Sequence, residues 1–154
     1  MNIKKITLIL FPIFLIGFIG AFIYFVTGIT STSPPIKEYG YSGSPDYLIS
    51  SFQKYVVINR DLTLRITDTT GNANNGYAIF MTLEMKYIEY GLKFEEDNSS
   101  DKSKTTIKLV SAYDKSRNVG GYSKDAEGVD QLVDIFEMSI LSPFKAKMGI
   151  KIFP

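Results

Sequence analysis

In this 154-residue chain, the residues that could act in catalysis are serines, lysines and acidic residues that lie close together in the sequence. A lysine can activate a nearby serine nucleophile, and two carboxyl groups can divide the roles of general acid and base. The candidates are Ser111 with Lys115, Ser103 with Lys104, Glu84 with Glu89, and Glu95 with Glu96. Such pairs also arise by chance, and the glutamates alternate with other residues as exposed strand positions do. We therefore assign no catalytic residue.

The chain contains neither histidine nor cysteine. It cannot build a Ser-His-Asp or Cys-His nucleophile, a Cys/His zinc site, a thiolate iron–sulfur cluster or a His-ligated haem from its own residues. Disulfides and an acylated cysteine are excluded for the same reason. We predict no cofactor. The absence of these residues favours a binding function over a catalytic one.

An acidic loop has part of a calcium-binding pattern. Asp97, Ser99 and Asp101 repeat at the first three ligand spacings of a calcium loop, whose oxygen ligands suit a hard cation. Lys102 stands where that loop needs glycine, and Lys108 where it needs a bidentate glutamate. We interpret the loop as solvated and predict no metal site.

Two stretches have apolar residues at helical spacing. The first begins at Ser44-Pro45-Asp46, which supplies a serine cap, a proline at the first helical position and an acidic first turn. The second begins near Ser123 or Asp125, and Pro143 ends or kinks it. The predicted core positions of the second helix are Val129, Leu132, Val133, Phe136 and Ile140.

Apolar and polar residues alternate elsewhere, as they do in half-buried strands. Residues 62–67 and 106–113 each predict one strand. Residues 77–94 alternate with a change of phase, so we expect either two strands joined by a turn near residues 89–91 or one strand bent by a bulge there. A last short strand is predicted in the tail, residues 148–154.

The order of helix, strands, helix and final strand lacks the alternation of a parallel sheet. We predict an α+β domain over residues 44–154 with two layers, an antiparallel sheet of four to five strands and two helices. About 110 residues are enough to enclose one modest core.

Residues 6–29 carry no charge, and 18 of these 24 residues are apolar. A helix of this length extends roughly 36 Å, enough to cross a hydrocarbon core of about 30 Å. The segment is longer than the apolar region of a secretory signal peptide, and a Ser/Thr-rich stretch rather than a small-residue cleavage site follows it. We predict a retained signal anchor, which is a single-pass transmembrane helix.

The charges beside this segment predict its orientation. Lys4 and Lys5 lie within residues 1–5, and no charge follows the segment until Lys37. The positive-inside rule places residues 1–5 in the cytoplasm and the C-terminal domain in the periplasm or outside the cell. Residues 30–43 are rich in Pro, Ser and Gly without clear periodicity, and we predict a short stalk there.

The outward part of the chain has nearly balanced charge. Without Lys4 and Lys5 it holds 15 basic and 16 acidic side chains, a net charge of −1, so nucleic acid is a poor partner. Tyrosine suits surfaces that are partly apolar and partly wet. Tyr39, Tyr41 and Tyr122 lie in predicted stalk or loop sequence, where they either form a contact surface or cover the edge of the core.

These features favour a non-catalytic interaction or ligand-binding module of the cell envelope. An anchor, a stalk and a compact domain are sufficient for that role. The expected partners are the lipid bilayer and either another envelope protein or a small ligand. The alternative is a membrane-tethered hydrolase, which needs a cleft where a Ser–Lys or carboxylate pair converges.

Overall fold

The computed structural model describes residues 34–72, 76–96 and 104–154. For residues 70–72, 76 and 77 it describes the backbone only. The predicted anchor over residues 6–29, residues 1–5, for which a cytoplasmic location is predicted, and the acidic loop over residues 97–103 lie outside this part of the chain. Among the described residues, no helix has both the length and the apolar character needed to span a bilayer. Residues 34–154 make up one structural unit.

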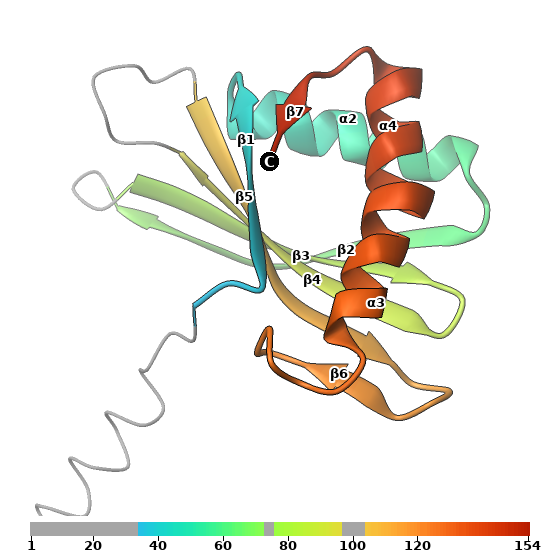
Figure 1. The fold of residues 1–154 in the computed structure, drawn as a ribbon. Coiled ribbons are helices and arrows are strands. Elements are labelled where there is room, and N and C mark those ends of the chain that lie inside the picture. The colour runs from blue at the N-terminus through green and yellow to red at the C-terminus, as the bar shows by residue number, and fades with distance from the viewer. Residues whose placement is uncertain (1–33, 73–75, 97–103) are drawn as a thin grey trace, which may run out of the picture. The chain divides into compact units, whose positions relative to one another are not determined.

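Seven strands form one antiparallel sheet in the order β2-β3-β4-β5-β1-β7, and β6 pairs with β5 (Figure 1). The strands are β1 (Lys37–Ser42), β2 (Leu62–Asn72), β3 (Gly76–Met85), β4 (Ile88–Glu96), β5 (Lys104–Asp114), β6 (Val119–Gly121) and β7 (Ile152–Phe153). The predicted α+β class is confirmed. The sheet has seven strands rather than four to five because β1 and β6 were not anticipated.

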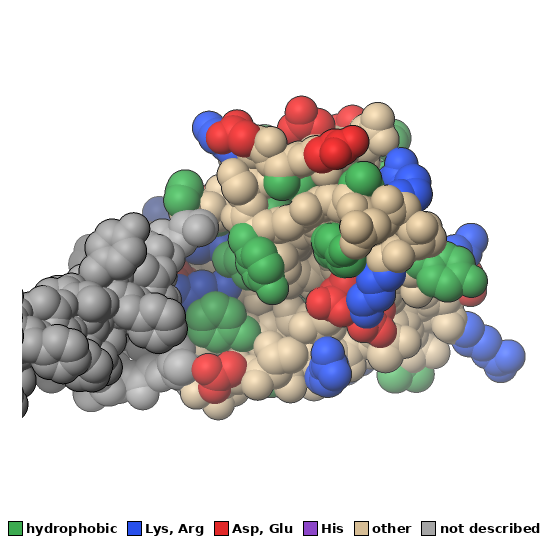
Figure 2. Space-filling view, turned by 90° about the horizontal axis from the view of Figure 1, so that it is seen from below, with side chains coloured by type: hydrophobic (Ala, Val, Ile, Leu, Met, Phe, Trp, Pro, Cys, Tyr) green, Lys and Arg blue, Asp and Glu red, His purple; other side chains and the backbone are tan. Residues whose placement is uncertain are grey.

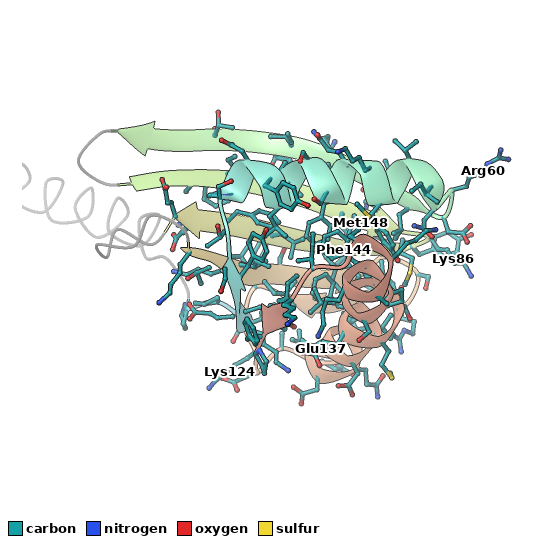
Figure 3. The ribbon with its side chains drawn as sticks, turned by 90° about the horizontal axis from the view of Figure 1, so that it is seen from above. Arg60, Lys86, Lys124, Glu137, Phe144 and Met148 are labelled. Atoms are coloured by element: carbon teal, nitrogen blue, oxygen red, sulfur yellow. The ribbon has the colours of Figure 1, made fainter. Side chains whose placement is uncertain are left out.

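The first helix, α2 (Pro45–Ile58), starts where its sequence predicts. The Ser44 side chain accepts a hydrogen bond from the backbone N–H of Tyr47, which satisfies one of the unpaired donors of the first turn. Leu48, Phe52 and Tyr55 face the sheet and are buried. Figure 3 shows α2 and the second helical stretch over the same face of the sheet.

The second helical stretch contains α3 (Val129–Ile135), the π-helical segment η1 (Phe136–Leu141) and α4 (Ser142–Met148). It starts later than predicted, after Gly128, which adopts a left-handed φ of 78°. Pro143 does not end it. The N–H of Ser142 bonds to the carbonyl of Glu137, five residues back, and this wider turn accommodates a proline that has no N–H to donate. All five predicted core positions are buried.

Residues 37–42, part of the predicted stalk over residues 30–43, form strand β1 inside the sheet. β1 pairs with β5 along its whole length and with β7 at Gly40 and Tyr41. The stalk prediction is therefore wrong for these six residues, and the folded domain begins before residue 44. The sequence signal was weak because Tyr39 and Tyr41 are the only large apolar residues in the strand.

The turn between β3 and β4 lies at Lys86 and Tyr87, not near residues 89–91. Met85 pairs directly with Ile88, and Lys86 has a positive φ of 56°, as tight hairpin turns require. The chain reverses there, so the inward side chains change from odd positions in β3 to even positions in β4. This reversal explains why the alternation of apolar and polar residues over residues 77–94 changes phase.

Aromatic side chains join the helices to the sheet. Phe52 of α2 stacks on Phe144 of α4, with 3.9 Å between ring centroids. Phe136 lies between Tyr39 of β1 and Tyr90 of β4, at centroid distances of 6.0 and 5.2 Å. All five side chains are buried, so one core holds the two layers together.

Candidate functional site

The face of the sheet that the helices do not cover, here called the outer face, is the candidate interaction surface. Its side chains alternate with core residues along the strands, so they point away from α2 and α3. They include Glu38, Thr63, Arg65, Thr82, Glu84, Glu89, Lys93, Glu95, Thr106 and Lys108. Viewed from the side opposite to Figure 3, Figure 2 shows acidic and basic side chains interspersed with apolar ones.

A small depression lies on the outer face between β2 and β3. It is lined by Thr63, Arg65, Thr82 and Glu84 and has a volume of about 90 Å³. Pockets for drug-sized ligands are several times larger, on the order of 300–1,000 Å³. This depression therefore suits a side chain of a partner better than a whole organic ligand.

Ion pairs cross the outer face between β1, β5 and β4. The Lys108 ammonium lies 2.6 Å from a carboxylate oxygen of Glu95 and 3.7 Å from one of Glu38, and Lys93 also pairs with Glu95. Partial burial alone would raise the pKa of Glu95, but the hydrogen bonds from the two lysines outweigh it and hold that pKa below its usual value. These charged side chains are therefore held in place before any partner binds.

Lys115 holds together the predicted carboxylate pair at the end of β5. Its ammonium lies 3.1 Å from Glu84 and 2.8 Å from Glu89, so the structure does bring these two glutamates together. The Lys115 hydrogen bond lowers the pKa of Glu84, whereas a general acid needs a raised pKa. Lys115 donates to the glutamates rather than to Ser111, so the predicted Ser–Lys pair is not assembled.

The other predicted catalytic pairs are not assembled into a described site. Glu95 and Glu96 are consecutive in β4, so their side chains point to opposite faces of the sheet. Ser103 lies outside the described residues. No group of three or more acidic side chains that could hold a metal ion is found within the ranges that the structure describes.

The three tyrosines of the predicted contact surface have different environments. Tyr39 is 3% exposed and belongs to the core, so it cannot contribute to a contact surface in this fold. Tyr41 is half-buried and packs against the same core. Tyr122 is 73% exposed, and its role in contacts stays a prediction. Tyr47 and Tyr87 are also exposed, although nothing in the alternation pattern had distinguished them.

Tyr39 instead fixes β1 to the second helical stretch. Its hydroxyl donates a 2.9 Å hydrogen bond to Glu137, and Lys37 lies 2.6 Å from the same carboxylate oxygen. Burial and the bond to Glu137 raise the pKa of Tyr39 well above its usual range. Burial would raise the pKa of Glu137 as well, but Lys37 and Tyr39 lower it on balance. These contacts give the cluster a structural role, since they join β1 to η1.

Asp114 organises the turn between β5 and β6. Its carboxylate accepts hydrogen bonds from the backbone N–H and hydroxyl of Ser116 and from the backbone N–H and Nε of Arg117. Arg117 also reaches Gln131 of α3, so this turn is tied to the helix layer. The bonds from Ser116 and Arg117 hold the pKa of Asp114 well below its usual value of 3.8.

Asp114→Asn should reduce the dependence of stability on acidic pH. Because the pKa of Asp114 is lowered on folding, its stabilising contribution is complete above the unfolded value near 3.8 and disappears as the pH falls toward the folded value. Urea unfolding of the full chain in detergent should show a smaller loss between pH 4 and pH 2 in the variant, which is already less stable at pH 7. Asp134→Asn, at an exposed position outside the first turn of α3, serves as control and should follow the wild type. Equal acid sensitivity of Asp114→Asn and wild type would contradict this role.

No protein-family model, curated protein or solved structure matches the chain.

Proposed function

We propose that the protein is a single-pass membrane protein whose extracytoplasmic domain binds another envelope protein through the outer face of its sheet. The observation that supports binding is the outer face itself, an uncovered surface on five strands with charged side chains already held by ion pairs. Ion pairs at a protein surface each contribute only about 0–1 kcal/mol, so a partner can replace these partly exposed pairs without unfolding the domain.

The amino-acid sequence supports the membrane attachment. Residues 6–29 are uncharged and long enough to span, and Lys4 and Lys5 favour a cytoplasmic N-terminus. Only seven residues, 30–36, separate this segment from β1. At about 3.3 Å per extended residue they reach roughly 23 Å. A tether this short would hold the domain close to the bilayer and restrict its partners to proteins of the same envelope.

The alternative of a membrane-tethered hydrolase has less support. The one candidate pair that the described residues bring together, Glu84 with Glu89, forms ion pairs with Lys115 on an open sheet face. Catalysis by two carboxyl groups needs one with a raised pKa, and the pKa of Glu84 is lowered. The described depression on this face, about 90 Å³, is smaller than the pockets that hold drug-sized ligands.

Site-specific photocrosslinking in native membranes tests the proposal. A photoreactive residue at Thr106 lies on the outer face, and one at Gln53 lies on the exposed side of α2 as a matched control. We expect a discrete adduct with one envelope protein from Thr106 and none from Gln53. Adducts of equal yield at both positions, or no protein adduct together with a small molecule that copurifies with the protein, would contradict it.

A further inference from the structure

The strand β2 forms a long free edge of the sheet. It has eleven residues and, within the part of the chain that the structure describes, pairs with β3 alone, whereas the opposite end of the sheet is the two-residue β7. The unpaired N–H and C=O groups of such an edge can template another strand. Of the features that commonly protect free edges, β2 has charged side chains and a β-bulge but neither lysine nor proline.

A β-bulge in β2 places two opposite charges on the same face. Arg65 pairs with Thr82, and Asp68 pairs with Phe80, which is two residues further along β3 and therefore on the same face. In a regular strand, the side chains of two residues three positions apart point to opposite faces of the sheet. The bulge between Ile66 and Asp68 inserts one extra residue, so the side chains of Arg65 and Asp68 both lie on the outer face.

The charge pattern of this edge is complementary to itself. When two copies of β2 run antiparallel with a two-fold axis between residues 66 and 67, Arg65 of each copy faces Asp68 of the other. We propose that β2 pairs with β2 of a second copy of this chain, so that the two sheets become one continuous sheet. The two-fold axis is then perpendicular to the sheet, and both outer faces lie on the same side of the dimer.

The neighbouring side chains are suited to this pairing. Asp68 accepts the N–H of Thr69 at 2.7 Å through Oδ1, which leaves Oδ2 to accept from the arginine of the second copy. Ile66 is 43% exposed at the edge, and Val57 and Ile58, in the helix that packs on β2, are also exposed. Pairing of the two edges would remove Ile66 from water.

Charge reversal on the full-length chain in detergent micelles tests the pairing. Arg65→Asp places two like charges opposite each other twice in the dimer, and so does Asp68→Arg. Light scattering should show a dimer for the wild type and at least about tenfold weaker association for each single variant. The double variant R65D/D68R restores opposite charges across the edge and should restore the dimer. A monomeric wild type, or a double variant no better than either single variant, would overturn the proposal.

Disulfide crosslinking separates this edge from any association through other parts of the chain. The native chain has no cysteine, so Ile66→Cys and Thr67→Cys can be expressed together on chains with different tags. The two positions face each other in the proposed register, and a disulfide should join the two tags in membranes. The same pair in the R65D background should not crosslink. Equal crosslinking in both backgrounds, or capture of a different protein at Ile66, would overturn the pairing.

Discussion

Phe144→Ala is expected to lower the free energy of unfolding by about 3–5 kcal/mol, the usual cost of removing a fully buried aromatic ring. The Phe144 ring stacks on Phe52 at 3.9 Å and meets Tyr55 edge-on at 5.4 Å, so its loss opens a cavity between α2 and α4. Urea denaturation of the full chain in detergent, followed by near-ultraviolet circular dichroism, measures the change.

Phe153→Ala is the matched control, because it removes the same ring from a position in β7 that is 52% exposed. We expect its effect to remain within about 1 kcal/mol, as is usual for exposed positions. A loss below about 1 kcal/mol for Phe144→Ala would show that the helices do not share the core described above.

Tyr39→Ala should have the second large effect, also about 3–5 kcal/mol, because the side chain fills the core between β1 and Phe136. Tyr39→Phe keeps the ring and removes only the hydrogen bond to the Glu137 carboxylate, so a smaller loss of about 1.5–3 kcal/mol is expected. The same urea denaturation measures both variants.

The Tyr39 variants decide whether residues 37–42 belong to the fold. Tyr122→Ala removes an exposed ring outside the core and should change stability by less than about 0.5 kcal/mol. If residues 37–42 were a stalk, Tyr39→Ala would behave like Tyr122→Ala. An equal and small effect of both variants would therefore contradict the position of β1.

The elements with strong local signals could be predicted from the sequence. The Ser44-Pro45 start of α2 depends on hydrogen bonds within one turn, and the long strands depend on alternation over many residues. β1 and β6 lack such signals because both are short, β1 has only two large apolar residues, and β6 is one valine with two glycines. They become strands because β5 offers them a partner, and that partner is distant in sequence for β1.

The candidate site was less predictable because its geometry depends on strand register. Glu84, Glu89 and Lys115 are near one another only after the turn at Lys86 and Tyr87 and the pairing of β4 with β5 are known. The sequence pattern also placed Tyr39 in a stalk, either as a contact residue or as a cover for the edge of the core, and so did not predict its position within the sheet. The self-complementary edge was invisible as well, because only the bulge brings Arg65 and Asp68 to one face.

The proposed dimer would extend the proposed binding function. Two outer faces on one side of a continuous sheet would present a surface twice as wide to a partner in the envelope. Binding of that partner would then gain from two linked contacts, since the second contact forms at a high effective concentration.

Labelling with a membrane-impermeant maleimide tests most directly whether the domain is tethered and faces outward. The chain has no native cysteine, so Gln53→Cys on the exposed side of α2 and Asn2→Cys near the N-terminus each carry a single thiol, and both keep Lys4 and Lys5. In intact cells we expect Gln53→Cys to be labelled without permeabilisation, and Asn2→Cys to be labelled only after it. Labelling of Asn2→Cys in intact cells with protection of Gln53→Cys would contradict the orientation, and recovery of both variants in the soluble fraction would contradict the anchor.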